Sequence, residues 1–235
     1  MASQNRSDLR GISDFDIIKL EVISSTGQVV NLQESAWVAL NLVGDLYSSA
    51  IFGEIHMSDA LNLPQQFDWT GNEIINLTFS TPSKLPIVFT GRVTEISPRT
   101  QPSDTQSLYS IRFISAEAVR SLQIKVRKGF INTPYSEMVK QVYTRHLYPI
   151  GNKSLFIEPT LKMASMSLPG WNPLKTLRKL AIKSQSENPK YNLASYVFFE
   201  RANDGDSVPG RSGFLFVSLE SLLYKEQGPY KAGNE

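Results

Sequence analysis

Residues 74–80 have the sequence IINLTFS, an alternation of apolar and polar side chains that decides the fold class. Successive side chains of an extended strand point to opposite faces, so Ile75, Leu77 and Phe79 share one face and the polar residues between them share the other. Further strand-like segments occur on both sides of this one, at residues 15–22, 28–32, 36–42, 51–56, 87–93 and 108–114. About seven strands without a long intervening helix predict an antiparallel sandwich or barrel.

Helical periodicity replaces this pattern at Ser115. Ser115 is a candidate N-cap for a short helical turn, and Thr133-Pro134 begins a longer helix with proline at its first position. The inward stripe of the longer helix is Tyr135, Met138, Val139, Val142, Tyr143, His146 and Leu147. Another helix begins at Asn172-Pro173, and strand patterns return at residues 196–200 and 213–219. The sequence therefore predicts an α+β chain that is mainly β.

The composition argues against most enzyme classes. The chain has 235 residues, of which 41% are apolar and 20% charged, so it can bury a substantial core. It contains no cysteine and only two histidines, His56 and His146. Thiol nucleophiles, thiolate metal sites and multi-histidine sites are thereby excluded or disfavoured. We expect no catalytic, metal or cofactor site, and no signal peptide or membrane span, because the N-terminal residues are polar and no apolar run is long enough.

The charge is distributed unevenly along the chain. Residues 1–117 carry 7 Lys and Arg against 13 Asp and Glu, a net charge of −6. Residues 118–190 carry 13 against 3, a net charge of +10, and residues 191–235 carry 4 against 6. Such a basic segment is typical of proteins that bind nucleic acid, an anionic surface or an acidic partner, but it also occurs as a solvated face. Charge alone does not choose among these alternatives.

Several short motifs follow one another in the order found in a known family. They are residues 46–55 (LYSSAIFGEI), 69–75 (WTGNEII), 87–93 (IVFTGRV), 115–122 (SAEAVRSL), 128–130 (KGF), 134–139 (PYSEMV), 169–174 (PGWNPL) and 196–200 (YVFFE). Together they resemble the central baseplate hub protein of contractile phage tails, which is related to the spike bases of secretion systems. Hub proteins of this kind are considerably longer, so the resemblance implies that the chain is a fragment or a reduced relative.

The resemblance implies three parts. Residues 1–117 would form a tube-like β domain, residues 118–190 a basic helical segment, and residues 191–235 the strands of a second, incomplete tube-like β domain. Such hubs are non-enzymatic virion proteins of the tail baseplate. They form trimers whose six tube-like domains join a threefold spike to the sixfold tail tube, with other baseplate proteins around them.

The resemblance also implies a lumen through which DNA passes without being bound specifically. We expect residues 1–117 to line much of it, and we expect the basic segment to lie at subunit contacts. The candidate interface residues are on the outer face of the second helix, at Lys175, Arg178, Lys179 and Lys183. A secretion-system spike base and a nucleic-acid-binding module built on residues 118–190 are the alternatives.

Overall fold

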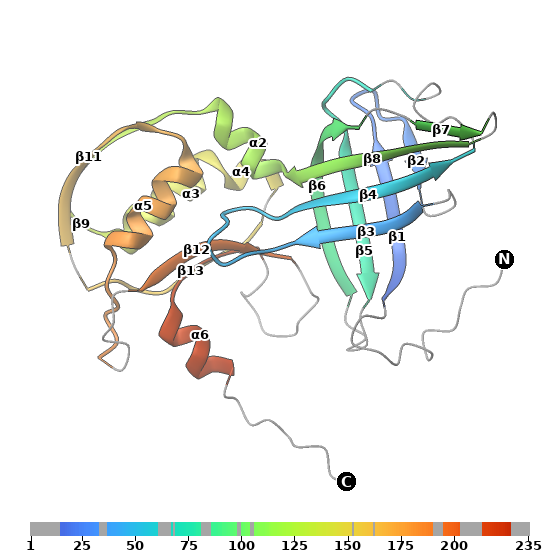
Figure 1. Ribbon diagram of the computed structural model, residues 1–235. Helices are drawn as coiled ribbons and strands as arrows, with labels where there is room; N and C mark the ends of the chain where they lie inside the picture. The colour runs from blue at the N-terminus through green and yellow to red at the C-terminus, as the bar shows by residue number, and fades with distance from the viewer. Residues whose placement is uncertain are drawn as a thin grey trace, which may run out of the picture. The chain divides into compact units, whose positions relative to one another are not determined.

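The computed structural model describes residues 15–32, 37–60, 67, 69–80, 86–97, 100–103, 106–151, 153–161, 163–189, 195–202 and 213–226. The chain divides into two compact units (Figure 1). We call residues 1–44, 50–119 and 201–212 the β unit, and residues 45–49, 120–200 and 213–235 the helical unit. The proposed three-part division at residues 117 and 190 stays a prediction.

The β unit is built on one eight-stranded sheet. Its strands are β1 (Asp16–Ile23), β2 (Val29–Asn31), β3 (Trp37–Val43), β4 (Phe52–Asp59), β5 (Ile74–Ser80), β6 (Pro86–Ile96), β7 (Thr100–Ser103) and β8 (Gln106–Ser115). The order is β2-β1-β5-β6-β8-β4-β3, with β7 beside β8, and every strand pair with a determined register is antiparallel. Figure 1 shows the sheet curling, so that β3, β4 and β8 cross over β1, β5 and β6. The prediction of an antiparallel β fold for this region is confirmed.

The curled sheet encloses the first hydrophobic core. Its fully buried members come from alternate positions of the strands, including Leu20, Ile55, Ile75, Leu77 and Ile111. The two-residue period of apolar residues in the sequence therefore corresponds to the burial of one face of each strand. In β5 the buried and less buried positions alternate from Ile74 to Leu77, as the alternation in the sequence predicts.

The helical unit combines helices with two small sheets. Its elements after α2 (Ala116–Gln123) are β9 (Val126–Pro134), α3 (Tyr135–His146), α4 (Tyr148–Gly151), β10 (Leu155–Ile157), β11 (Met163–Trp171), α5 (Pro173–Lys183), β12 (Tyr196–Arg201), β13 (Gly213–Ser218) and α6 (Leu219–Glu226). One sheet has the order β10-β13-β12, with β10 parallel to β13, and the other pairs β9 with β11. None of the described helices is long and apolar enough to cross a membrane.

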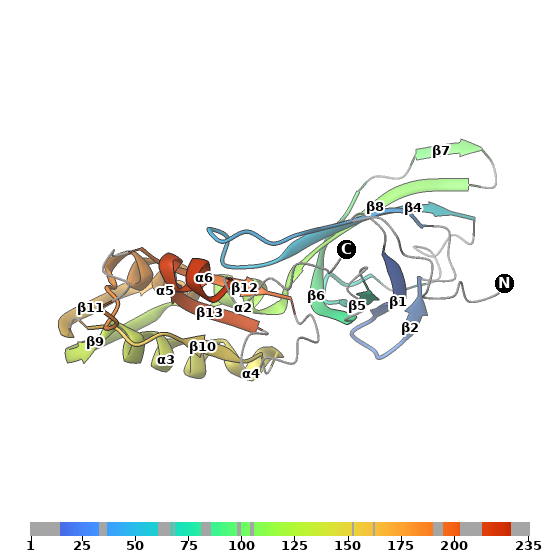
Figure 2. The ribbon, with the colours of Figure 1, turned by 90° about the horizontal axis from the view of Figure 1, so that it is seen from below.

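The strands β12 and β13 are buried on both faces. Tyr196 and Phe198 pack with the inward residues of α3 and α5, whereas Val197 and Phe199 pack with Leu222 and its neighbours in α6. Figure 2 shows α3 on one side of this sheet and α6 on the other. Burial on both faces explains why residues 196–199 are continuously apolar and do not alternate. The strands predicted to begin a second β domain thus share a core with the helices of this unit.

The three predicted helices are present, with differences at their N-termini. Asn172 caps α5 as predicted, because its side chain accepts a hydrogen bond from the backbone N–H of Lys175 at 2.8 Å. The start of α3 was predicted wrongly by one position, since Pro134 is the extended N-cap and the helix begins at Tyr135. The hydroxyl of Ser115, the predicted N-cap of α2, donates to the backbone C=O of Ile51 at 3.1 Å and accepts from the backbone N–H of Ile51 at 3.2 Å.

Candidate interaction surfaces

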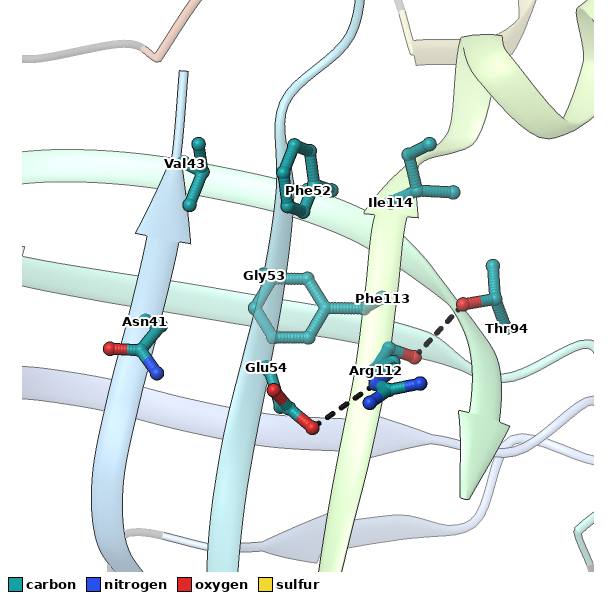
Figure 3. A pocket seen from close by; sticks show the side chains of 9 residues that line it. All are labelled: Asn41, Val43, Phe52, Gly53, Glu54, Thr94, Arg112, Phe113 and Ile114. Atoms are coloured by element: carbon teal, nitrogen blue, oxygen red, sulfur yellow. Dashed lines mark hydrogen bonds and ion pairs between the residues drawn. The ribbon is translucent and has the colours of Figure 1, made fainter. Parts of the chain in front are cut away.

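A groove lies on the solvent-facing side of β3, β4, β6 and β8 (Figure 3). Its volume is about 550 Å³, and its lining is Asn41, Val43, Phe52, Gly53, Glu54, Thr94, Arg112, Phe113 and Ile114. Val43 is paired with Phe52 and Phe52 with Ile114, so strand register places three apolar side chains in one row across the sheet. Val43 and Phe52 are exposed, which makes this row an apolar strip open to solvent.

The floor of the groove depends on a glycine. A Cβ atom at Gly53 would lie 2.4 Å from Cζ of Phe113 and 2.7 Å from the carbonyl oxygen of Asn41. Figure 3 shows the ring of Phe113 extending across Gly53, in the space that a side chain would occupy. The glycine of the FGEI motif is therefore required by close packing between neighbouring strands.

The wall beside the apolar row carries an ionic network that joins three strands. Arg112 on β8 donates from Nε to Glu54 on β4 at 3.1 Å and from Nη1 to Glu95 on β6 at 3.0 Å. Partial desolvation tends to raise the pKa of Glu54, but the bond and charge of Arg112 outweigh it, and the pKa is lowered. The network lies in solvent, so it orients side chains more than it stabilises the fold.

The strand β3 ends the sheet beside the groove. Among the described residues, β4 is its only neighbour in the sheet, so every second residue of β3 turns its N–H and C=O away from β4. Its sequence, WVALNLV, contains no charge and no proline. Natural proteins usually protect a free edge of this kind with charges, proline or a covering segment, because it pairs readily with another strand. This edge lacks those side-chain protections.

The four basic residues predicted to form an interface lie together on α5. Lys175, Arg178, Lys179 and Lys183 are all exposed, and none of them forms an ion pair with a described residue. The opposite side of the helix carries the buried residues Leu177, Leu180 and Ala181. Ile182 is 70% exposed among the four cations. The structure therefore brings the predicted residues to one face, which has a single apolar side chain among its charges.

The surface of the helical unit is more basic than its sequence composition indicates. Within the described part of residues 120–200, Glu187 is the only exposed acidic residue. Glu200 is buried and ion-paired with Lys153, and Glu158 is half-buried and accepts hydrogen bonds from Ser186 and Ser218. Among the described residues of 120–200, exposed basic side chains therefore outnumber exposed acidic ones.

The acidic excess of residues 1–117 is not all at the surface. Asp59, Glu73 and Glu117 are buried, and Glu54 and Glu95 share Arg112. A lining formed by this part of the chain would therefore repel DNA less strongly than the net charge of −6 indicates.

The two histidines are in different settings. His56 on β4 shares a hydrogen bond of 2.8 Å with the hydroxyl of Ser110, between Nδ1 and Oγ. His146 is half-buried near the end of α3, and burial followed by the charges of Arg145, Lys128 and Arg120 lowers its pKa. No three potential metal ligands come together in the described part of the chain.

The hydrogen bonds of the Glu73 carboxylate account for the residue types in the WTGNE motif. This carboxylate accepts hydrogen bonds from the hydroxyl of Thr70 at 3.0 Å and from the backbone N–H of Gly71 at 3.1 Å, as well as from the N–H of Thr70. Gly71 has φ +80°, a left-handed conformation that glycine adopts without strain. Burial tends to raise the pKa of Glu73, but these hydrogen bonds outweigh it, so the pKa is lowered.

Replacing Glu73 with glutamine will make the stability of the protein less dependent on pH. A carboxylate whose pKa is lowered by folding stabilises the folded state above the pKa it has when unfolded, about 4.5, and this contribution is lost as the pH falls through the folded value. At neutral pH the variant should be less stable by about 1.5–3 kcal/mol, because hydrogen bonds to a charged acceptor are replaced. Urea unfolding from about pH 7 to about pH 3 measures both effects.

The matched substitution Glu95→Gln, at an exposed carboxylate, should change stability by less than about 1 kcal/mol at every pH. An equal loss in the two variants would contradict the role of Glu73.

The fold is similar to that of two phage tail proteins and of a chain in a PdpA–VgrG complex. No family model matches the chain, and no curated protein does either. The 43 kDa tail protein of prophage MuSo2 from Shewanella oneidensis aligns with a TM-score of 0.53 at 9% identity, over 85% of this chain and 53% of its own. The tail protein of Neisseria meningitidis MC58 aligns with a TM-score of 0.51 at 10% identity, over 84% of this chain and 49% of its own.

A chain of the half-lidded Francisella PdpA–VgrG complex aligns with a TM-score of 0.50 at 10% identity, over 94% of this chain and 34% of its own. The present chain therefore spans about half the length of the two tail proteins and less of the third structure. The expected likeness to tail and spike-associated proteins is confirmed at the level of the fold.

The sequence did not reveal the groove or its ionic network. Glu54, Glu95 and Arg112 come from three strands, and their proximity depends on a register that the sequence does not specify. The strands β9 and β11 were not predicted either. A partial signal was present in β9, where the apolar residues Val126 and Phe130 and the aliphatic stem of Lys128 occupy every second position.

Proposed function

We propose that the chain is a structural, non-enzymatic hub component of a contractile tail or a related injection machine, in which copies of it join a spike to a tail tube. The observation that carries this proposal is the uncharged free edge of β3 beside the groove, in a fold shared with tail proteins. In the proposed assembly, copies form a trimer around a lumen, at the baseplate end of the tail. The spike, the tube protein and the surrounding baseplate proteins are its partners.

The four cations of α5 are proposed to lie at a subunit contact. Opposite charges across an interface accelerate association and fix its register. A lone exposed isoleucine among them, Ile182, provides an apolar centre of the kind that interface cores use.

An electron-microscopy map of the purified, assembled chain tests the proposed function. A closed threefold ring with a lumen is expected. A monomer at high concentration, or an open filament, would overturn the hub assignment. A secretion-system spike base remains the alternative, and co-purification with tube and spike proteins from each type of system would separate the two.

A lysine at Val38 will prevent assembly. Val38 is 67% exposed and lies at an irregularity in the pairing of β3 with β4, so a lysine is compatible with the folded monomer. Its charge would be placed at the free edge, where it blocks pairing with another strand. Light scattering is expected to give the mass of a monomer for Val38→Lys.

The control for this edge variant is Val88→Lys. Val88 is also an exposed valine of the sheet, but it lies in β6, away from the edge. This variant should assemble like the parent chain. Normal assembly of Val38→Lys would show that the β3 edge is not used.

A further inference from the structure

The ribbon formed by β9 and β11 has an unpaired edge of its own. Residues 127–130 of β9 pair with β11 in regular antiparallel register, from Arg127–Pro169 to Phe130–Met166, and β9 has no other neighbouring strand in the described structure. The ribbon is held firmly, because Val126 and Phe130 belong to the core that also contains Met138 and Val142 of α3. Its outer backbone groups are therefore presented in a fixed, extended conformation.

The two edges of the ribbon differ. The strand β11 contains Pro169, which has no N–H to donate, and its register shifts between Pro169 and Trp171. At that shift the extra residue, Gly170, belongs to β11, whereas β9 keeps its donors from Val126 to Phe130. The extra residue of β9 lies beyond Phe130, in the segment where Asn132 has φ 46°. The edge able to accept another strand is thus the β9 edge.

The side chains around this edge are basic. Lys125 and Arg127 are exposed, and Lys128 lies 4.9 Å from the ring centroid of Phe130 and donates a hydrogen bond to Gln141. Gln141 in turn donates to Glu137 at 3.0 Å, so this carboxylate is linked to Lys128 through an amide. Burial is the main cause of the lowered pKa of His146, and the positive charges of Arg145, Lys128 and Arg120 lower it further.

We propose that the β9 edge binds an acidic, extended segment of a partner protein, which joins the ribbon as a third strand. Main-chain hydrogen bonds supply affinity in this mode of recognition, and side chains supply specificity. The cations around β9 repel basic segments and attract carboxylates, so they favour an acidic strand over a basic or an uncharged one. Ile131, which is 85% exposed at the end of the regular pairing, favours an apolar residue at one end of the bound segment.

A peptide fits this surface better than a nucleic acid. Binding of single-stranded nucleic acid relies on exposed aromatic rings on which bases stack. The aromatic residues of the ribbon are Phe130, which is buried, and Trp171, which is half-buried. The inference is independent of the proposed hub function, since it concerns a site within the helical unit alone.

The test uses the full chain and a synthetic nine-residue peptide in which glutamate alternates with valine. Amide hydrogen exchange and the titration of His146 are followed by nuclear magnetic resonance. At a peptide concentration about ten times the Kd, we expect exchange of the outward-facing amides between Val126 and Phe130 to slow by about tenfold. The pKa of His146 should rise, because the peptide's carboxylates offset the neighbouring cations.

Two control peptides separate strand addition from simple charge attraction. A peptide with an N-methyl group on every amide keeps its carboxylates but loses its backbone donors on both edges, and it should not slow exchange in β9. A peptide with lysine in place of glutamate should not bind. Equal protection by either control, or tighter binding at β9 by a single-stranded oligonucleotide, would overturn the proposal.

Matched charge reversals locate the site. The variant Lys125→Glu/Arg127→Glu should weaken peptide binding by about tenfold, and each exposed charge contributes modestly. The control Lys175→Glu/Arg178→Glu changes the net charge equally on α5 and should bind nearly as the parent chain does. Equal weakening in the two variants would show that the peptide responds only to overall charge. Circular dichroism verifies that each variant is folded.

Discussion

Replacing Lys153 with methionine will lower the free energy of unfolding by about 3–5 kcal/mol, because it removes the cation from a buried ion pair. The side chain of Glu200 is 1% exposed and pairs with the ammonium group of Lys153. The backbone carbonyl of Lys153 also accepts a hydrogen bond of 2.8 Å from the hydroxyl of Tyr143, which fixes the segment on α3. Chemical denaturation of the variant measures the loss.

Two further variants identify the cause of that loss. The double variant Lys153→Met/Glu200→Leu removes both charges and should recover most of the stability, since a buried ion pair is often replaceable by apolar residues. Lys140→Met, at an exposed lysine of α3, should alter stability by no more than about 0.5 kcal/mol. If the double variant were no more stable than Lys153→Met, lost packing and not the buried charge of Glu200 would explain the effect.

Reversing the charges of Lys175, Arg178, Lys179 and Lys183 to glutamate is expected to abolish assembly and leave the monomer folded. The four side chains are exposed, so each contributes only about 0–1 kcal/mol to the stability of the monomer. Across an interface the same charges would face a surface of opposite sign, and reversal would convert attraction to repulsion. Sedimentation measures assembly, and circular dichroism measures folding.

The salt dependence of the parent chain provides an independent check of this interface. Assembly should weaken as salt is raised, since the screening length falls to about 8 Å near physiological ionic strength. A variant with glutamine at the four positions should assemble weakly and show little salt dependence. Normal assembly of the glutamate variant would mean that this face of α5 is only solvated.

The sequence predicted elements well where one face of an element is buried. The alternation in β5 and the helical stripes of α3 and α5 correspond to single buried faces. Prediction failed for β9 and β11, which pair across a separation that includes all of α3. In β11 the alternation is weak, since serines lie between small or flexible apolar residues.

The candidate surfaces were predicted only in part. The basic face of α5 follows from helical periodicity, because residues three and four positions apart lie on one side of a helix. The groove and the two free edges depend on which strands are neighbours and which strand lies last in a sheet. These are properties of the sheet as a whole, and single segments of sequence do not carry them.

The parallel pairing of β10 with β13 determines when the helical unit completes its core during synthesis. Phe156 of β10 pairs with Leu215 of β13, and Phe214 lies against Tyr143 with ring centroids 5.3 Å apart. The ribosome therefore releases α3, α5 and their apolar stripes well before the strand that covers them. Long-range pairing of this kind is slow, and uncovered apolar surface promotes aggregation in the meantime. A nascent chain stalled before residue 213 would accordingly be a substrate for chaperones that shield apolar helices.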